Sequence, residues 1–215
     1  MGIPTIVRKI SLGKNSDGGI LIDDTAGWED IIGDISPDTT GAGSATLATF
    51  RGANTRAWFY TTNDRCDMLF HIPHNYKKGT DLYLHLHWVH QGTSISGELV
   101  VTYGVTYAKG HNQVSDGNFI TEVAPVLTVV TPNITTIPQY RHRVDELQLS
   151  ATTPTATQLD TDILEPDGII LVGLTATTIP SIGGGATNLP AFLTCDLHYQ
   201  SMGIGTKQKA PDFYV

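Results

Sequence analysis

The segment Asp81–His90 most constrains how this chain can fold, because a leucine or tryptophan occupies every second position from 82 to 88. Successive side chains of a β-strand leave opposite faces, so the alternation predicts a strand. One face would carry only apolar side chains, those of Leu82, Leu84, Leu86 and Trp88. The other would carry Tyr83, His85, His87 and Val89. The apolar face requires a second layer of structure, and the aromatic character of the other face indicates a central strand covered on both sides.

Further strands are predicted at the short, regular spacing that is typical of a sandwich or barrel. The segments with a strand pattern are Ala57–Thr61, Asp67–His71, Leu82–His90, Glu98–Tyr107, Val126–Val130, Tyr140–Leu149, Gly168–Thr175 and Phe192–Gln200. A charged fraction of only 16% suits a protein of strands and turns. We therefore expect an all-β fold, a β-sandwich of jelly-roll type, over residues 48–201, with extended arms at both ends.

Residues 1–47 are expected to form an N-terminal arm and loop, and residues 202–215 a C-terminal arm. Within the first of these, Gly27–Gly33 is interpreted as one helical turn closed by Gly33. The arms carry apolar residues that an isolated sandwich would leave partly exposed: Ile6, Ile10, Ile20, Ile22, Phe213, Tyr214 and Val215. Closed symmetry usually covers such surface, so we expect a homo-oligomer, specifically a homotrimer, with these residues in its contacts.

Composition and motifs exclude several classes of function. A net charge of −8 opposes binding to nucleic acid or to an anionic membrane, and no apolar run approaches the ~18 residues of a membrane span. Cys66 and Cys195 are expected to be reduced residues of the core. The sequence has no Gly-rich phosphate loop, nucleophile elbow or CxxC pair. We therefore expect a protein that is not an enzyme and has no cofactor.

Two predicted strands place titratable side chains on their less apolar faces. Asp196 and His198 share one face of Phe192–Gln200, as His85 and His87 share one face of the first strand. If these strands are neighbours, the four residues form a carboxylate–imidazole network, and we expect its role to be mainly structural. A surface or subunit-interface location and a metal site are the alternatives.

The other histidines receive no functional assignment. His71 and His74 flank Pro73 at the start of a predicted loop, and His111 lies in a predicted turn at a strand end. His142 lies in the small basic cluster Arg141–Arg143, which is interpreted as exposed strand.

A metal-binding alternative also follows from the spacing of the first two histidines. Gly79, five further residues and then His85-Leu86-His87 match the opening of the cupin metal motif, in which two imidazoles on one strand face hold an ion. The match then fails, because Gln91 stands where the motif has glutamate and no second motif follows.

Several segments together resemble a family of tailed-phage virion proteins. They are Asp81–Trp88, Ala108–Gln113, Leu164–Gly168, Asp196–Gln200 and Lys209–Tyr214, in the same order and across most of the chain. The resemblance implies a structural component of a phage particle, assembled in the bacterial cytoplasm, and carries no catalytic residue over to this chain.

The expected function combines this resemblance with the physical properties of the chain. An acidic protein is disfavoured beside DNA on the inner wall of a capsid, which favours the outer shell. We therefore expect a decoration or cement protein that contacts the major capsid protein or other virion proteins. A tail, neck or fibre component with a carbohydrate-binding or adaptor role is the first alternative, and a cupin-like metal-binding protein is the second.

Overall fold

The computed structural model describes residues 13–14, 20–21, 27–39, 43–52, 54–115, 117, 119, 123–131 and 137–202. Most of both expected arms, including Ile6, Ile10, Ile22, Phe213, Tyr214 and Val215, lies outside the described residues. In the first part of the expected N-terminal arm, two short strands are described, β1 (Gly13–Lys14) and β2 (Ile20–Leu21), which pair antiparallel. No helix in the described part of the chain is long and apolar enough to cross a membrane.

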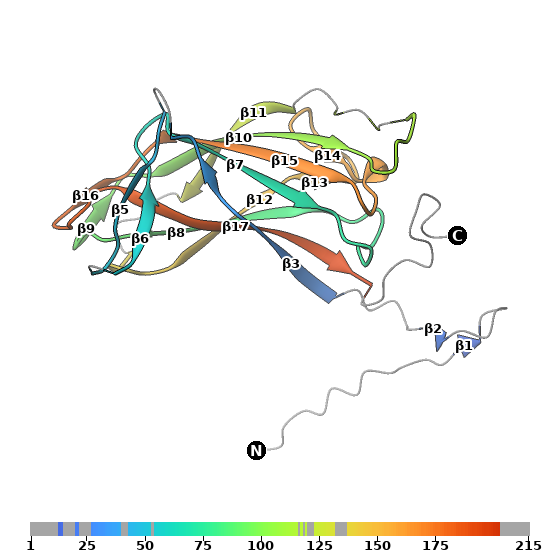
Figure 1. Ribbon diagram of the computed structural model, residues 1–215, viewed down its shortest axis with the longest axis horizontal. Helices are drawn as coiled ribbons and strands as arrows, with labels where there is room; N and C mark the ends of the chain where they lie inside the picture. Colours follow the sequence, from blue (N-terminus) through green and yellow to red (C-terminus); the bar gives the residue numbers. More distant parts are fainter. Residues whose placement is uncertain are drawn as a thin grey trace, which may run out of the picture.

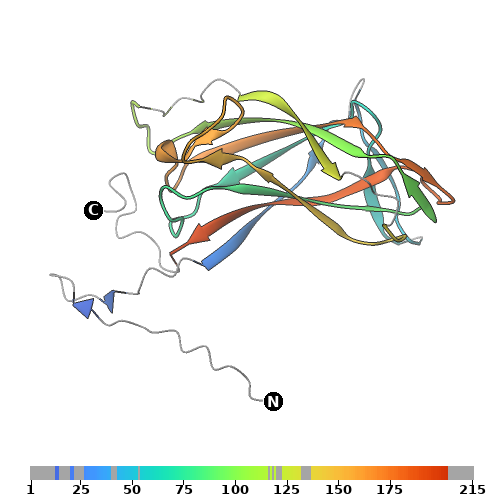
Figure 2. The ribbon, with the colours of Figure 1, turned by 180° about the vertical axis from the view of Figure 1, so that it is seen from behind.

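Two stacked antiparallel sheets form the body of the protein (Figures 1 and 2). The five-stranded sheet has the order β11 (Val123–Thr131), β10 (Leu99–Ala108), β15 (Ile169–Thr178), β7 (Arg65–His71) and β4 (Ser36–Pro37). The six-stranded sheet has the order β12 (Arg143–Gln148), β8 (Tyr83–His90), β17 (Pro190–Ser201), β6 (Arg56–Phe59) and β5 (Thr46–Thr49), and β3 (Gly27–Gly33) also pairs with β17.

Small elements complete the sandwich. They are the paired strands β9 (Ser94–Ser96) and β16 (Ser181–Gly183), the paired strands β13 (Ser150–Ala151) and β14 (Leu159–Asp160), and the short helix η1 (Thr161–Ile163).

The strand order is that of a jelly roll. Its eight principal strands, in chain order, are β6, β7, β8, β10, β11, β12, β15 and β17. The first pairs with the eighth, the second with the seventh, the third with the sixth and the fourth with the fifth, always antiparallel. Such nested pairs arise when one long hairpin is rolled up, and alternate pairs then fall into opposite sheets. The prediction of an all-β jelly-roll sandwich is therefore confirmed, and all eight predicted strands are present.

The alternation of β8 produces the expected division between core and surface. Leu84, Leu86 and Trp88 are fully buried between the sheets, and the inward side chains of β10 and β15 lie in the same core. Strand β8 is central, because it pairs with β12 on one side and with β17 on the other. The second face of β8 was expected to be covered by another layer. No further layer within the described ranges covers it, and the side chains there shield one another.

The segment Gly27–Gly33 is a strand and not the helical turn expected from the sequence. It pairs with β17 in the six-stranded sheet, and β4 then pairs with β7 in the other sheet, so β3 and β4 connect the two layers at one edge (Figure 1). Part of the segment 1–47 that was assigned to an arm and loop therefore belongs to the sandwich. Gly33 permits this crossing, because a Cβ atom there would lie 2.5 Å from the ring of Phe70.

Candidate functional site

A row of titratable side chains crosses the outer face of the six-stranded sheet. Glu146 of β12 lies opposite His85 of β8, His85 lies opposite Asp196 of β17, and Asp196 lies opposite Ile32 of β3. The row exists because paired residues of neighbouring strands place their side chains on the same face. The condition set for a shared network, that the two histidine-bearing strands are neighbours, is thus met.

His85 stands between two carboxylates. Its Nδ1 lies 3.0 Å from Oδ2 of Asp196, and its Nε2 lies 3.0 Å from Oε2 of Glu146. Asp196 is the most shielded member of the row, with 8% of its side chain exposed, whereas Glu146 is open to solvent. A neutral imidazole carries one N–H and can donate to only one of these two carboxylates.

His87 also contacts Asp196, although its paired residue on β17 is Thr194. Its Nε2 faces Oδ1 of Asp196, but this nitrogen is buried and the contact lacks the geometry of a hydrogen bond. Its Nδ1 lies 2.8 Å from Nε2 of His142, and the two rings stack with their centroids 4.9 Å apart. Both imidazoles of β8 therefore direct one nitrogen toward Asp196 and the other toward a polar partner.

His198 extends the cluster toward β3. Its ring lies between two others, with its centroid 4.6 Å from that of His85 and 4.7 Å from that of Trp28. Its Nδ1 pairs with Oδ1 of Asp30, which is exposed and lies opposite His198 in the pairing of β3 with β17. The four candidate residues of the sequence analysis, His85, His87, Asp196 and His198, are thus brought together on one face.

Two overlapping groups in this cluster have the donor atoms of a metal site. His85, His87 and Asp196 form one group, and Asp30, His85 and His198 form the other. Within each group, one donor atom per residue lies within 4.8 Å of the others. Imidazole nitrogen and carboxylate oxygen are common ligands of divalent first-row metals.

The cupin arrangement is not reproduced. The space between the sheets beneath the histidines is filled by Leu84 and Leu86, and the imidazoles project outward. Gln91, which stands at the glutamate position of the cupin motif, is buried and bonds the backbone elsewhere. Its Nε2 donates to the carbonyl of Thr49, and its Oε1 accepts from the backbone N–H of Arg51.

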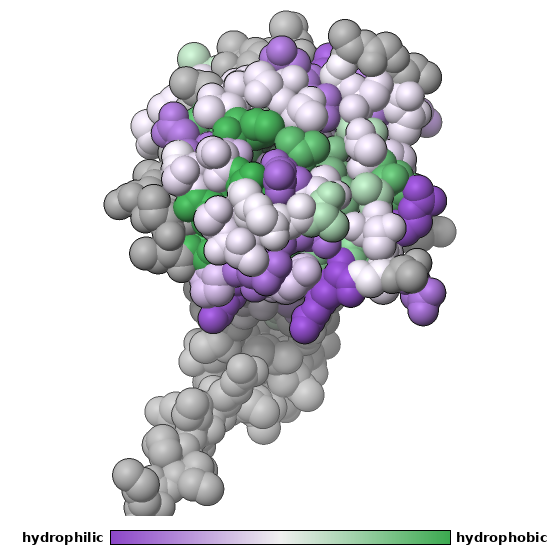
Figure 3. Space-filling model, turned by 90° about the vertical axis from the view of Figure 1, so that its left-hand side faces the viewer, coloured by the Kyte–Doolittle hydropathy of each residue, from purple (hydrophilic) through white to green (hydrophobic). Residues whose placement is uncertain are grey.

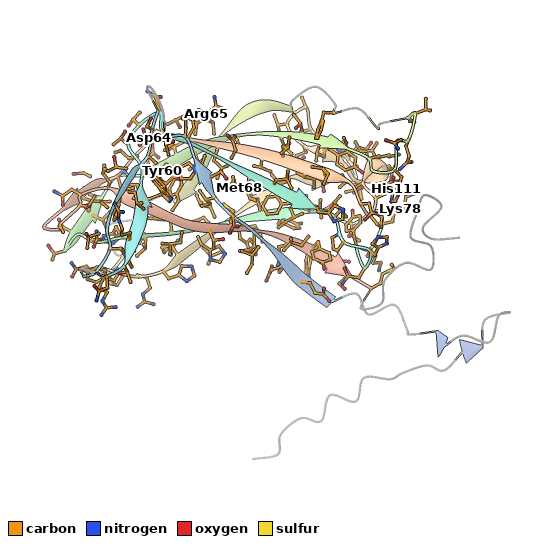
Figure 4. The ribbon with its side chains drawn as sticks, in the orientation of Figure 1. Tyr60, Asp64, Arg65, Met68, Lys78 and His111 are labelled. Carbon is orange, nitrogen blue, oxygen red and sulfur yellow. The ribbon has the colours of Figure 1, made fainter. Side chains whose placement is uncertain are left out.

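A second histidine cluster, which the sequence analysis did not predict, surrounds Asp167 at one end of the sandwich. His71 and His74 place their Nε2 atoms 3.3 Å and 3.0 Å from Oδ1 of Asp167, and Nε2 of His111 contacts Oδ2. Figure 4 shows His111 at this end of the molecule, with Tyr60 and Asp64 toward the other. Burial alone would raise the pKa of Asp167, but the hydrogen bond from His111 and the charges of the histidines lower it overall.

Three members of the network were missed as site residues: Asp30, His142 and Glu146. Glu146 could have been found by aligning the alternation of the strand around Tyr140–Leu149 with that of β8, which puts it opposite His85. Asp30 lies in the segment that was interpreted as a helical turn, and His142 precedes β12. No local signal distinguishes either of them.

Comparison with known proteins gives little further information. No family model and no curated protein matches this sequence. Among the solved structures, the K3 cleaved adhesin domain of Lys-gingipain from Porphyromonas gingivalis w83 is similar over 80% of this chain and 88% of that chain. Its sequence identity is 16% and its TM-score is 0.26, which is too low to support an inference.

Proposed function

We propose that this chain is a non-enzymatic structural protein of a tailed-phage particle, which binds the outer surface of the capsid as a decoration or cement protein. The observation that carries this proposal is the place of the resembling segments in the fold. Asp81–Trp88 and Asp196–Gln200 lie on the adjacent strands β8 and β17 and supply His85, His87, Asp196 and His198.

The next two resembling segments also meet in space. Ala108–Gln113 contacts Leu164–Gly168 through the pair His111–Asp167 and through Gln113, whose Nε2 donates to Glu165. Four segments that are far apart in sequence therefore form two contact regions of one sandwich. The resemblance thus involves residues that hold the fold together. The fifth segment, Lys209–Tyr214, lies outside the described residues.

The fold and its surface agree with an assembly protein. Jelly rolls are frequent among viral capsid proteins, lectins and cupins. Exposed apolar side chains project from the outer face of the six-stranded sheet, namely Trp28, Ile32, Val144 and Leu193. Apolar patches also interrupt the polar surface at the end of the sandwich that carries β5, β6, β9 and β16 (Figure 3). Such patches commonly mark contacts with other proteins.

Copy number in purified virions tests the proposal. A decoration protein should approach the major capsid protein in abundance, on the order of hundreds per particle, because it covers the shell. Particles that lack the chain should package DNA but lose it at a lower temperature, since a ligand that binds only the assembled shell stabilises that shell by mass action. Quantitative gel densitometry that gave a few dozen copies or fewer would contradict the proposal.

The low copy number would instead support the first alternative, a tail, neck or fibre component with a carbohydrate-binding or adaptor role. The observation in its favour is a shallow depression lined by Trp28, Tyr83 and Gln200. Its two aromatic rings are inclined at 67° and do not form one flat platform. For this reason we prefer the decoration role. Retention of the chain on immobilised host polysaccharide, lost in Trp28→Ala, would favour the alternative.

A further inference from the structure

We propose that His85, His87 and Asp196 form a binding site for a single divalent transition-metal cation of the zinc type, which joins β8 to β17 on the outer face of the sheet. The site is additional to the proposed function and holds whether or not the chain belongs to a virion.

Each imidazole has one nitrogen already assigned to a polar partner. Nε2 of His85 lies 3.0 Å from Oε2 of Glu146, and in the tautomer that leaves Nδ1 free for a metal, a proton on Nε2 donates to that carboxylate. Nδ1 of His87 lies 2.8 Å from Nε2 of His142, and a proton on Nδ1 donates to the lone pair there. The remaining nitrogens, Nδ1 of His85 and Nε2 of His87, then present lone pairs.

Both lone pairs face the shielded carboxylate of Asp196. Nδ1 of His85 is 3.0 Å from Oδ2, and Nε2 of His87 faces Oδ1 with no hydrogen bond. Three electron-pair donors directed at one another repel unless a proton or a cation lies between them. A divalent cation satisfies all three donors while every imidazole stays neutral in a single tautomer.

The surroundings match those of metal-ligating histidines. Such histidines usually donate their second N–H to a carboxylate or another acceptor, which fixes the tautomer and the ring orientation. Glu146 has this role for His85, and His142 has it for His87. Bond lengths of about 2.0–2.2 Å keep the ligands of zinc roughly 3–4 Å apart, and the three donor atoms here lie within 4.8 Å of one another.

The group Asp30, His85 and His198 is the less suitable of the two. Asp30 is exposed, with 52% of its side chain open to solvent, and its carboxylate is already paired with Nδ1 of His198. The ring of His198 is also held between those of His85 and Trp28. Asp196, in contrast, is 8% exposed and receives two imidazoles.

Titration of the full chain with Zn²⁺ tests the site. The chain is treated with chelator, transferred to metal-free buffer and titrated by calorimetry, and Co²⁺ is added to a second sample to read the ligand field by visible absorption. We expect saturation at one ion per chain, a rise in melting temperature with Zn²⁺ and a Co²⁺ spectrum of low coordination number. A folded chain without saturable binding would overturn the proposal.

Substitutions then locate the ion. Asp196→Asn, which keeps the side-chain volume, and His87→Ala should each weaken binding by at least about 100-fold, and Glu146→Gln by about 10-fold because it acts through His85. His198→Ala and His111→Ala are the matched controls and should change binding by less than about twofold. Loss of binding in either control, with binding retained in His87→Ala, would place the ion elsewhere and refute the assignment. Circular dichroism confirms the fold of each variant, and the wild-type titration decides the question if one variant does not fold.

Discussion

Asp196 lies directly opposite His85 in the pairing of β17 with β8, and its Oδ2 is 3.0 Å from Nδ1 of His85. This carboxylate is nearly enclosed, so its polar neighbours are the imidazoles beside it and not water. Asp30 on the same face differs from Asp196 in its exposure to solvent. It pairs with His198 but remains exposed. We therefore expect the two pairs to make different contributions to stability.

We expect His85→Ala to lower the free energy of unfolding by about 2–3 kcal/mol, because it removes one partner of a shielded carboxylate. His198→Ala should cost less than about 1 kcal/mol, since Asp30 is solvated without its partner. Denaturant unfolding in the presence of chelator measures both differences without any contribution from metal. Equal losses in the two variants would contradict this account of the network.

The crossing of β3 over Phe70 is expected to tolerate no side chain at residue 33. Gly33→Ala would place a Cβ atom 2.5 Å from a ring that is itself buried, and overpacking of this kind costs about 1–3 kcal/mol. Gly27→Ala in the same strand is the matched control, because a Cβ there meets nothing within 4 Å. Thermal melts should show a drop of roughly 3–9 °C for the first variant and almost none for the second.

Asp167 should make the stability of the protein depend on acid pH. Its pKa is lower in the folded chain than the ordinary value of 3.8, so the folded state binds fewer protons than the unfolded state near that pH. The stabilisation is therefore present above 3.8 and is lost as pH falls through the lower folded value. Asp167→Asn keeps a residue that tolerates the positive φ of 61° and should cost about 1 kcal/mol at pH 6.

The measurement for Asp167 is a series of melts between pH 2 and pH 7. The difference between wild type and Asp167→Asn should shrink toward the acid end. A difference that stays constant over this range would show that the carboxylate charge makes no contribution.

The two cysteines are expected to be unreactive in the native protein. Both are buried and free, and burial raises the pKa of Cys66 to about 12 and that of Cys195 well above its ordinary value. The thiolate is the reactive species, so an aromatic disulfide reagent at pH 8 should titrate neither thiol in the folded chain. In denaturant, both cysteines should react. Rapid reaction under native conditions would mean that the core around them opens readily.

We expect the full chain to assemble as a homotrimer, because exposed Trp28 and Ile32 add apolar surface to the apolar residues of both terminal segments. Light scattering after size exclusion should give three times the chain mass of 23.2 kDa. Removal of residues 204–215 should weaken assembly more than it lowers the melting temperature. A monomer at micromolar concentration would contradict this prediction.

The eight principal strands could be predicted because each carries a periodic pattern of its own. The alternation of Leu84, Leu86 and Trp88 is local information, and burial of those side chains follows from it. Strand β3 could not be found in this way. Its residues are mostly exposed, and it is a strand only because β17 offers a partner 160 residues or more away in sequence.

The candidate site was predictable to the same extent. Residues that share a strand face, such as His85 with His87, follow from periodicity, whereas their partners depend on which strands are neighbours and in which register. Glu146 enters the site through the pairing of β12 with β8. The cluster around Asp167 depends on three separate loops that meet at one end of the sandwich. The spacing of its residues along the chain does not predict that these loops are neighbours.

The position of β17 has a consequence for how the protein comes to be folded. This strand pairs with β8, β6 and β3, so the six-stranded sheet has a gap at its centre until residues 190–201 have been synthesised. A nascent chain that ends before this point leaves the facing backbone edges of β8 and β6 without the strand that pairs with both. We therefore expect this sheet to complete only after translation has passed this strand, and fragments that stop short of it to aggregate where the longer chain stays in solution.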